Sequence, residues 1–233
     1  MCGRYVSATP PDRLAHQLAV DTVQLAGHDH TPRYNVAPTS DIYSVVEGAA
    51  GRTLRTMRWG FVPQWAKTVG GRGQPINARL ETITSNRMFA SSWRQRRCLV
   101  PADAYYEWMD PGDGTPKNPY AIADLDKTPL AFAAIWRTWS PDAASDIGPQ
   151  PTTSTAIITT EARGNTALIH DRMPVILPAT LWDTWLSAEA DEAPYLHDAV
   201  LALDPPELTM TPISTRVNNV RNDGPELLEP VMA

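Results

Sequence analysis

Cysteine is scarce in this sequence, and long hydrophobic runs are missing from it. The 233 residues include only two cysteines, Cys2 and Cys98, which argues against a disulfide scaffold. No apolar run approaches the roughly 20 residues that cross a bilayer, and the first residues lack the apolar core of a secretory signal. These absences favour a protein of the reducing cytosol, so we expect a cytoplasmic location.

Basic residues are outnumbered, with 20 Lys and Arg against 26 Asp and Glu, for a net charge of −6. That excess alone argues against a nucleic-acid partner. The charge is segregated, however: residues 52–97 carry ten basic side chains and one acidic one, Glu81, whereas residues 183–233 carry ten acidic and two basic ones. Because the local field governs contacts with phosphates, an acidic protein can still present a basic face to DNA.

Proline is abundant, and its 22 copies divide the chain into short elements. Pro10 and Pro11 before Asp12 predict the start of a helix that buries Leu14 and Leu18. Short apolar, alternating or β-branched runs predict strands, and two later segments predict helices. The predicted strands are 41–47, 53–61, 97–100, 104–109, 120–123, 130–136 and 155–160, and the predicted helices are 178–186 and 191–201. The first two strands are expected to form a hairpin that turns at Gly48–Gly51. We expect one strand-rich α+β domain spanning residues 1–233.

Cys2 stands where removal of Met1 would leave an α-amine and a thiol on adjacent carbons. The α-amine has an ordinary pKa near ~7.7–8, far below the ~10.4 of lysine, so far more of it than of a lysine amine is a neutral nucleophile at pH 7. The thiol is a second nucleophile with a pKa near ~8.5. Such a 1,2-aminothiol forms an imine with an aldehyde, and the thiol then closes a five-membered thiazolidine ring.

Several polar and aromatic blocks are unusual for plain loops or core strands. In order along the chain they are Cys2-Gly-Arg-Tyr5, Tyr34-Asn-Val-Ala-Pro38, Trp59-Gly-Phe-Val-Pro63, Asn77-Ala-Arg-Leu-Glu81, Tyr106-Glu-Trp108 and His170-Asp-Arg-Met-Pro174. Together they closely resemble the SRAP (SOS-response-associated peptidase) family, whose members shield abasic sites in single-stranded DNA. The resemblance runs from Cys2 to about Val231. We expect the α+β fold to have a curved, barrel-like mixed β-sheet core with flanking helices.

The resemblance implies a role for each matching residue. Cys2 would be the crosslinking nucleophile, Asn77 would hold the Cys2 amine or the opened sugar, Glu107 would move protons beside Cys2, and His170 would act as general acid and base on the sugar ring oxygen. The implied DNA-contacting residues are Arg4, Asn35, Trp65, Arg79, Arg87, Met173 and Pro174. The expected partner is single-stranded DNA with an abasic site, bound by a monomer that becomes nucleoid-associated; no membrane, metal or cofactor is implied.

Simpler interpretations of the same residues remain open. Asn77 could cap a turn, and Glu107 could be a hydrogen-bonded strand residue. Two ordinary surface ion pairs are also possible, one between Arg79 and Glu81 and one between Asp171 and Arg172. His28 and His30 flank Asp29 but have no matching set of metal ligands, so a polar loop is favoured. Cys98 lies in an apolar run and is expected in the core.

Other functions also remain open. Cys2, His170 and Glu107 could form the nucleophile, base and orienting group of a thiol peptidase, including one that removes only its own Met1. A non-covalent reader of single-stranded or modified DNA would not need Cys2. A lyase would share the imine but break the strand by β-elimination before the thiol closes the ring.

Overall fold

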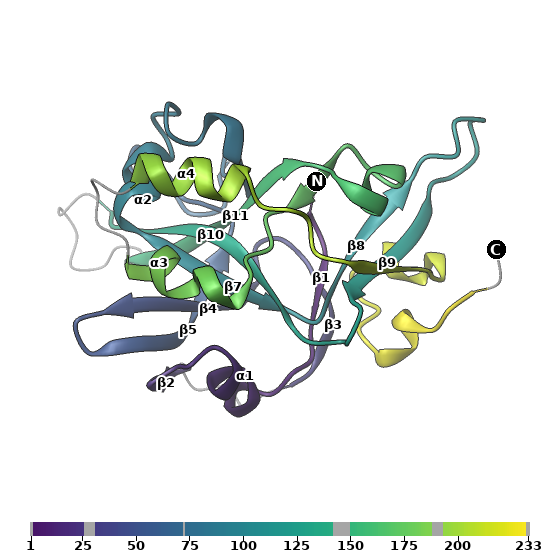
Figure 1. Cartoon of the computed structure of the whole chain (residues 1–233), viewed down its shortest axis with the longest axis horizontal. Helices are drawn as coiled ribbons and strands as arrows, with labels where there is room; N and C mark the ends of the chain where they lie inside the picture. Colours follow the sequence, from purple (N-terminus) through teal and green to yellow (C-terminus); the bar gives the residue numbers. More distant parts are fainter. Residues whose placement is uncertain (1, 26–30, 72, 142–149, 188–192, 232–233) are drawn as a thin grey trace.

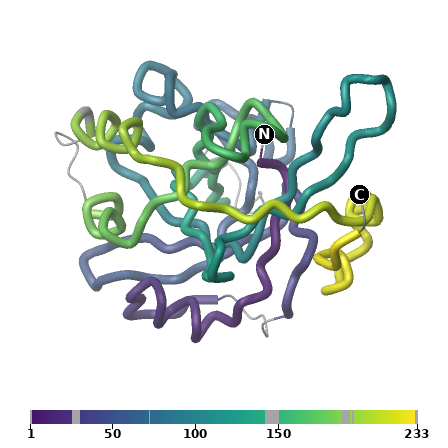
Figure 2. The backbone as a smooth tube through the Cα atoms, turned by 45° about the vertical axis from the view of Figure 1, so that its right-hand side comes forward, coloured from purple at the N-terminus to yellow at the C-terminus, as the bar shows by residue number. Residues whose placement is uncertain are grey.

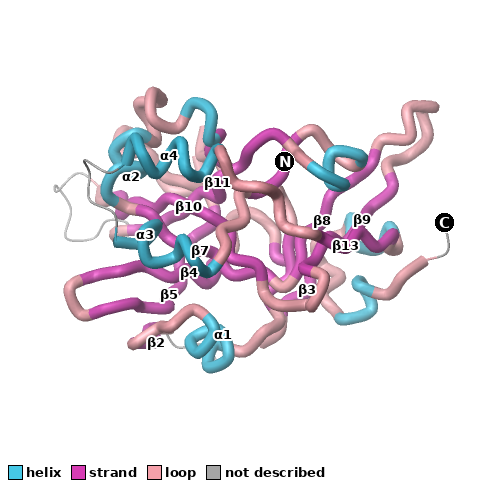
Figure 3. Tube along the Cα trace, in the orientation of Figure 1, coloured by secondary structure: helices cyan, strands magenta, loops and turns pink. Residues whose placement is uncertain are grey.

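The computed structural model describes residues 2–25, 31–71, 73–141, 150–187 and 193–231. Strands dominate it, and a few short helices lie around them (Figures 1 and 3). The strands are β1 (Tyr5–Ser7), β2 (Thr22–Gln24), β3 (Arg33–Val36), β4 (Asp41–Gly48), β5 (Gly51–Trp59), β6 (Asn77–Arg79), β7 (Arg97–Ala102), β8 (Ala104–Met109), β9 (Asn118–Asp124), β10 (Leu130–Trp139), β11 (Thr152–Glu161), β12 (Arg172–Pro174) and β13 (Leu208–Pro212).

The larger sheet is mixed and closes on itself. Its antiparallel pairs run from β11 through β10, β7 and β4 to β5, and β5 then pairs with β11 in parallel. This ring of hydrogen bonds gives the expected curved, mixed sheet, although it is not a true barrel. Strand β7 is buried along its whole length, which explains its nearly continuous apolar sequence.

The smaller sheet is antiparallel, in the order β13-β9-β8-β1-β3. One face of it packs on the larger sheet, and side chains from both fill the seam between them. Tyr5 and Tyr105 from the small sheet contact Phe132 of β10 edge to face, with ring centroids 6.3 and 5.9 Å from Phe132. We call this buried cluster the inter-sheet seam.

Helices cover the opposite face of the larger sheet. They are α1 (Pro11–Gln17), α2 (Ala90–Gln95), α3 (Trp182–Ser187) and α4 (Ala193–Leu201). The 3-10 turns are η1 (Leu80–Thr82), η2 (Gly164–Leu168), η3 (Ala179–Leu181), η5 (Thr215–Asn218) and η6 (Pro225–Leu228), and the last two pack on the outer face of the small sheet. The predicted burial of Leu14 and Leu18 is confirmed. No helix among the described residues is long and apolar enough to span a membrane.

Most predicted elements are present with shifted ends. The hairpin turning at Gly48–Gly51 is confirmed, with those two glycines paired, but its second strand ends at Trp59 rather than Phe61. The predicted helix 178–186 is a 3-10 turn followed by α3. Residues 97–102 and 104–109 belong to different sheets, so the chain crosses between the sheets at Asp103. The Asp103 carboxylate accepts hydrogen bonds from the backbone N–H groups of Ala8 and Thr9.

The loop between β8 and β9 projects from the body of the molecule, as the teal hairpin of Figure 2 shows. The start of β1 lies beside the green segment that joins β11 to β12 in both Figure 1 and Figure 2. Segments far apart in the sequence therefore meet at the beginning of the chain.

Phe132 joins the two sheets, and its truncation should be costly. Phe132→Ala leaves a cavity between Tyr5 and Tyr105, so we expect a loss of about 3–5 kcal/mol in the free energy of unfolding, measured by urea denaturation. Leu125→Ala is the control, because that side chain is 59% exposed and its loss should change stability by less than about 0.5 kcal/mol. Equal effects of the two substitutions would contradict this account of the seam.

Candidate active site

Cys2 lies at the end of the inter-sheet seam, just before β1. Its side chain is fully buried, and β1 pairs with β8 so that Tyr5 faces Tyr105. Continuing this antiparallel register brings the start of the chain beside Glu107. Burial, followed by the nearby Glu107 charge, raises the pKa of the Cys2 thiol well above its ordinary value. The thiol is therefore held in its neutral form.

Asn77 reaches Cys2 from the other sheet. It begins β6, which pairs in parallel with β11 so that Asn77 faces Ile157. The Asn77 Nδ2 donates a hydrogen bond to the Cys2 carbonyl oxygen at 2.9 Å. Its Oδ1 is buried and has no hydrogen-bond partner among the described residues. An acceptor left in this state carries a free-energy cost unless another donor occupies the site.

Glu107 lies in β8 and is only 3% exposed. Burial raises the pKa of its carboxyl group to about 7, and the Asp171 charge contributes in the same direction. A carboxyl group with this pKa is divided between its acid and its base form at neutral pH. It can therefore both give and accept protons there.

His170 lies in the turn between η2 and β12, a part of the chain that β12 ties to β11. Its Nδ1 is 2.6 Å from Asp171 Oδ1 and 3.0 Å from the backbone nitrogen of Arg172. Burial and the charge of the chain's α-amino group lower the pKa of His170, whereas Asp171 raises it. The two sheets thus bring Cys2, Asn77, Glu107 and His170 to one end of the seam.

Arg172 and Glu81 form an ion pair that fastens the His170 turn. Arg172 donates from Nη1 and Nη2 to the two carboxylate oxygens of Glu81 at 2.7 and 3.0 Å, and from Nη2 to the Thr159 carbonyl at 2.8 Å. The simpler pairings considered from the sequence were wrong, because Glu81 pairs with Arg172 rather than Arg79, and Asp171 contacts His170. Strand β11 lies between the paired segments, and the sequence gives no direct signal of this contact.

Arg4 and Asn35 contact each other and the C-terminal segment. Arg4 Nη1 donates to Asn35 Oδ1 at 2.8 Å and to the Val217 carbonyl at 2.9 Å. Asn35 is 3% exposed, and its Nδ2 lies within hydrogen-bond distance of three backbone carbonyls between residues 217 and 222. Both side chains therefore hold the C-terminal segment in place, and their contact with DNA stays a prediction.

The remaining residues expected at DNA differ in exposure. Arg79, Arg87 and Trp65 are exposed, the last at 61%, which leaves them accessible to a ligand. Met173 and Pro174 are buried in β12, three and four residues after His170. Cys98 is buried in the seam, as predicted. His28 and His30 lie outside the described residues, and no cluster of metal-ligating side chains occurs within the described ones.

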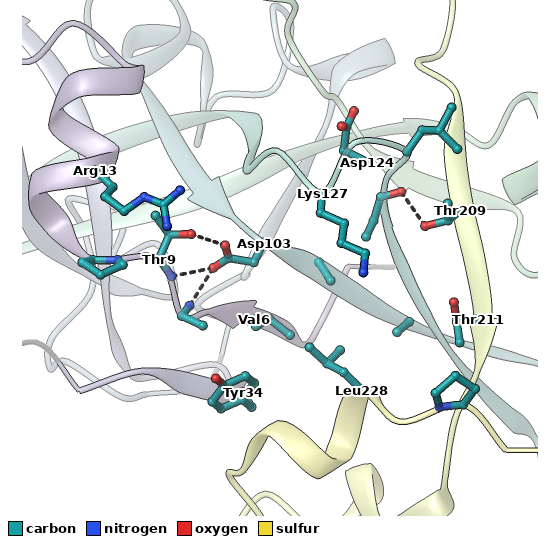
Figure 4. Close-up of a pocket in the computed structure, with 17 residues that line it drawn as sticks. Val6, Thr9, Arg13, Tyr34, Asp103, Asp124, Lys127, Thr209, Thr211 and Leu228 are labelled. Carbon is teal, nitrogen blue, oxygen red and sulfur yellow. Dashed lines mark hydrogen bonds between the residues drawn. The ribbon is translucent and has the colours of Figure 1, made fainter.

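A cavity of about 540 Å³ lies elsewhere, on the outer face of the small sheet (Figure 4). Val6, Ala104 and Ala121 line it, and all three face away from the seam. Because alternate residues of a strand point to opposite faces, Glu107 lies on the other side of this sheet. The cavity is therefore separate from the cluster around Cys2.

Comparison with known proteins identifies the family. The model of the family described as SOS response associated peptidase (SRAP) matches residues 1–220. The chain belongs to the SRAP family. It is 34% identical over 229 residues to the Abasic site processing protein YoaM of Bacillus subtilis, with 98% of each chain covered. It is 33% identical to the Abasic site processing protein YedK of Escherichia coli, covering 99% of this chain and 100% of that one.

Solved structures share the fold of this SRAP chain. A crystal structure of a protein from Bacteroides thetaiotaomicron superposes with a TM-score of 0.81 at 21% identity, covering 99% of this chain and all of the other. A phage-related protein from Bordetella bronchiseptica gives a TM-score of 0.69 at 28% identity, covering 91% and 94%. The expected α+β architecture, with its curved mixed sheet, is confirmed.

Burial of the Glu107 carboxyl group should make stability depend on pH. Between pH 4.5 and about 7 the folded carboxyl keeps a proton that the unfolded chain has lost, so stability falls as pH rises through this interval. Raising the pKa from 4.5 to about 7 corresponds to on the order of 3 kcal/mol. The stability of Glu107→Gln relative to the native protein should therefore increase by roughly this much when the pH is raised from 5 to 8. Urea denaturation at the two pH values measures this change. A stability difference that is the same at both pH values would contradict the assignment.

Proposed function

We propose that this SRAP protein captures abasic sites in single-stranded DNA covalently, through Cys2 exposed by removal of Met1. The observation that carries the proposal is the position of Cys2, buried at the end of the seam with Asn77 on its carbonyl and Glu107 beside its thiol. The relatives named as abasic site processing proteins support the same substrate.

The order of the two nucleophilic attacks follows from burial. A buried thiol beside a carboxyl group is held protonated, whereas an α-amine is about half neutral near pH 8. The amine therefore attacks first. This order favours an imine intermediate over the direct thiolate attack that a thiol peptidase would use.

The reaction then proceeds through four balanced steps. His170 protonates the ring oxygen of the abasic sugar while the C1′ hydroxyl loses its proton to water, so the C1′–O4′ bond breaks and an aldehyde forms. The Cys2 amine adds to C1′, and the adduct loses one water to give an imine. The Cys2 sulfur attacks C1′, and its proton passes to the nitrogen, which closes the thiazolidine. One water is lost overall.

Asn77 and Glu107 support these steps in different ways. The unpartnered Asn77 Oδ1 is a ready acceptor for the amine of Cys2 or a hydroxyl of the opened sugar. Glu107, with its pKa near 7, can take a proton from the attacking amine and return it to the departing hydroxyl. Losing either group should slow capture without removing the nucleophile.

The proposal of a single-stranded substrate rests on two exposed side chains. Arg79 lies two residues after Asn77 in the same strand and is exposed, which suits a phosphate contact. Trp65 offers an exposed ring on which an unpaired base can stack. Single-stranded DNA leaves the abasic sugar and its neighbouring bases accessible to both.

Covalent capture should depend on a cysteine with a free amine. We expect protein that begins at Cys2 to give a heat-stable shifted band with single-stranded DNA carrying one abasic site, on a denaturing gel. Cys2→Ala and protein that retains Met1 should both lose the stable band. A Met1-retaining protein that still forms it would favour the thiolate mechanism, and an unchanged band from Cys2→Ala would overturn the proposal.

Ring closure should protect the strand from cleavage. Cys2→Ser keeps the amine but closes its ring with a weaker nucleophile, so the imine lasts longer and β-elimination competes better. We expect this variant to cleave more of the abasic strand than the native protein, measured on a sequencing gel. Protein with Asn77→Ala serves as the control, since it slows capture but retains the thiol. Equal cleavage by native protein and Cys2→Ser would contradict a shielding role for the sulfur.

A further inference from the structure

The Nδ1 atom of His170 has two neighbours that require opposite protonation states. The backbone N–H of Arg172, at 3.0 Å, is a donor and needs a lone pair on Nδ1. The carboxylate of Asp171, at 2.6 Å, is an acceptor and needs a proton on Nδ1. One nitrogen cannot satisfy both at once. The stronger of these two interactions determines whether Nδ1 or Nε2 carries the proton of the neutral ring.

Other charges around His170 oppose its protonation. Burial of the ring lowers the pKa of His170, and the charges of Lys117 from the β8–β9 loop and of Arg172 act in the same direction. The Asp171 carboxylate opposes them, and it also acts on Glu107 across the site. Asp171 itself is highly exposed, at 83% of its side chain, and so adds little to the packing of the fold.

We propose that Asp171 is a positioning residue that holds the proton of His170 on Nδ1 and thereby assigns proton exchange with the sugar to Nε2. This inference rests on the proposed function and deepens it. Within this block the sequence resemblance implied roles for His170, Met173 and Pro174, and none for Asp171.

Both halves of the catalytic cycle use this arrangement. The doubly protonated ring donates Nδ1–H to Asp171 and gives its Nε2 proton to the ring oxygen as the C1′–O4′ bond breaks. The neutral ring that remains keeps Nδ1–H, so Nε2 has a lone pair that can take the next proton back. Without Asp171, the Arg172 N–H favours the other neutral tautomer, in which Nε2 already carries a proton and cannot act as a base.

The test measures the rate of covalent capture as a function of pH, with protein that begins at Cys2. Asp171→Asn removes the charge and keeps the size of the side chain, and Asp171→Glu restores the charge. Asp198→Asn is the matched control, because Asp198 Oδ1 lies 3.3 Å from Nδ1 of its neighbour His197 on α4. Two DNA substrates are compared: one with the closed abasic sugar, and one with an open-chain aldehyde in its place.

On closed abasic DNA we expect Asp171→Asn to capture at least about tenfold more slowly near neutral pH, in line with the loss of a general acid. The fall in rate at higher pH should move to lower pH, because the protonated ring is lost earlier without the carboxylate. Asp171→Glu should recover most of the rate, and Asp198→Asn should match the native protein. The open-chain aldehyde should erase the difference, since it needs no ring opening.

Two results would overturn the role of Asp171 while leaving the proposed function intact. One is a native rate and pH profile from Asp171→Asn on closed abasic DNA, and the other is an equal slowing on both DNA substrates, which would mark general damage to the site. If the native protein captures neither substrate, the proposed function fails, and this inference fails with it.

Discussion

Burial of the Glu107 carboxyl group beside Cys2 is the constraint on which the rest of the proposed chemistry depends. In water this carboxyl group would be ionised at neutral pH and could only accept protons. Removed from water, it has a pKa of about 7 and can serve both as acid and as base. The same burial keeps the neighbouring thiol neutral, which leaves the first attack to an amine. One desolvated environment thus raises the pKa of both groups, which suppresses the thiolate and prepares the carboxyl group for proton transfer.

That environment exists because two sheets meet at the beginning of the chain. The small antiparallel sheet supplies Cys2 and Glu107, and the larger sheet supplies Asn77 and, through β12, His170. Asn77 and Glu107 are held by backbone pairing within their own sheets, and the Arg172–Glu81 ion pair ties the His170 turn to η1. The aromatic contacts of Phe132 with Tyr5 and Tyr105 hold the sheets together. The spacing of the four groups therefore depends on the packing of the seam.

Local sequence predicted the elements better than their assembly. The β-branched run of β11, the apolar runs of β7 and β10 and the hairpin at Gly48–Gly51 are present because their patterns depend on near neighbours. The very short strands β1, β6 and β12 were not predicted, since three residues carry too little periodicity, yet these strands position the candidate site. The resemblance indicated Cys2, Asn77, Glu107 and His170 together. The Asp171–His170 contact and the Arg172–Glu81 pair depend on tertiary geometry. The ion pairs considered from the sequence were instead Asp171 with Arg172 and Glu81 with Arg79.

The most direct test of the account is the mass and location of the product formed with abasic DNA. Protein that begins at Cys2 is reacted with single-stranded DNA carrying one abasic site, treated with borohydride, digested and analysed by mass spectrometry. The account predicts an adduct on the peptide beginning at Cys2, with the mass of peptide plus sugar remnant less one water and unchanged by borohydride, as a closed thiazolidine requires. An adduct on a lysine side chain, or one that gains two hydrogens from borohydride as an open imine does, would contradict it.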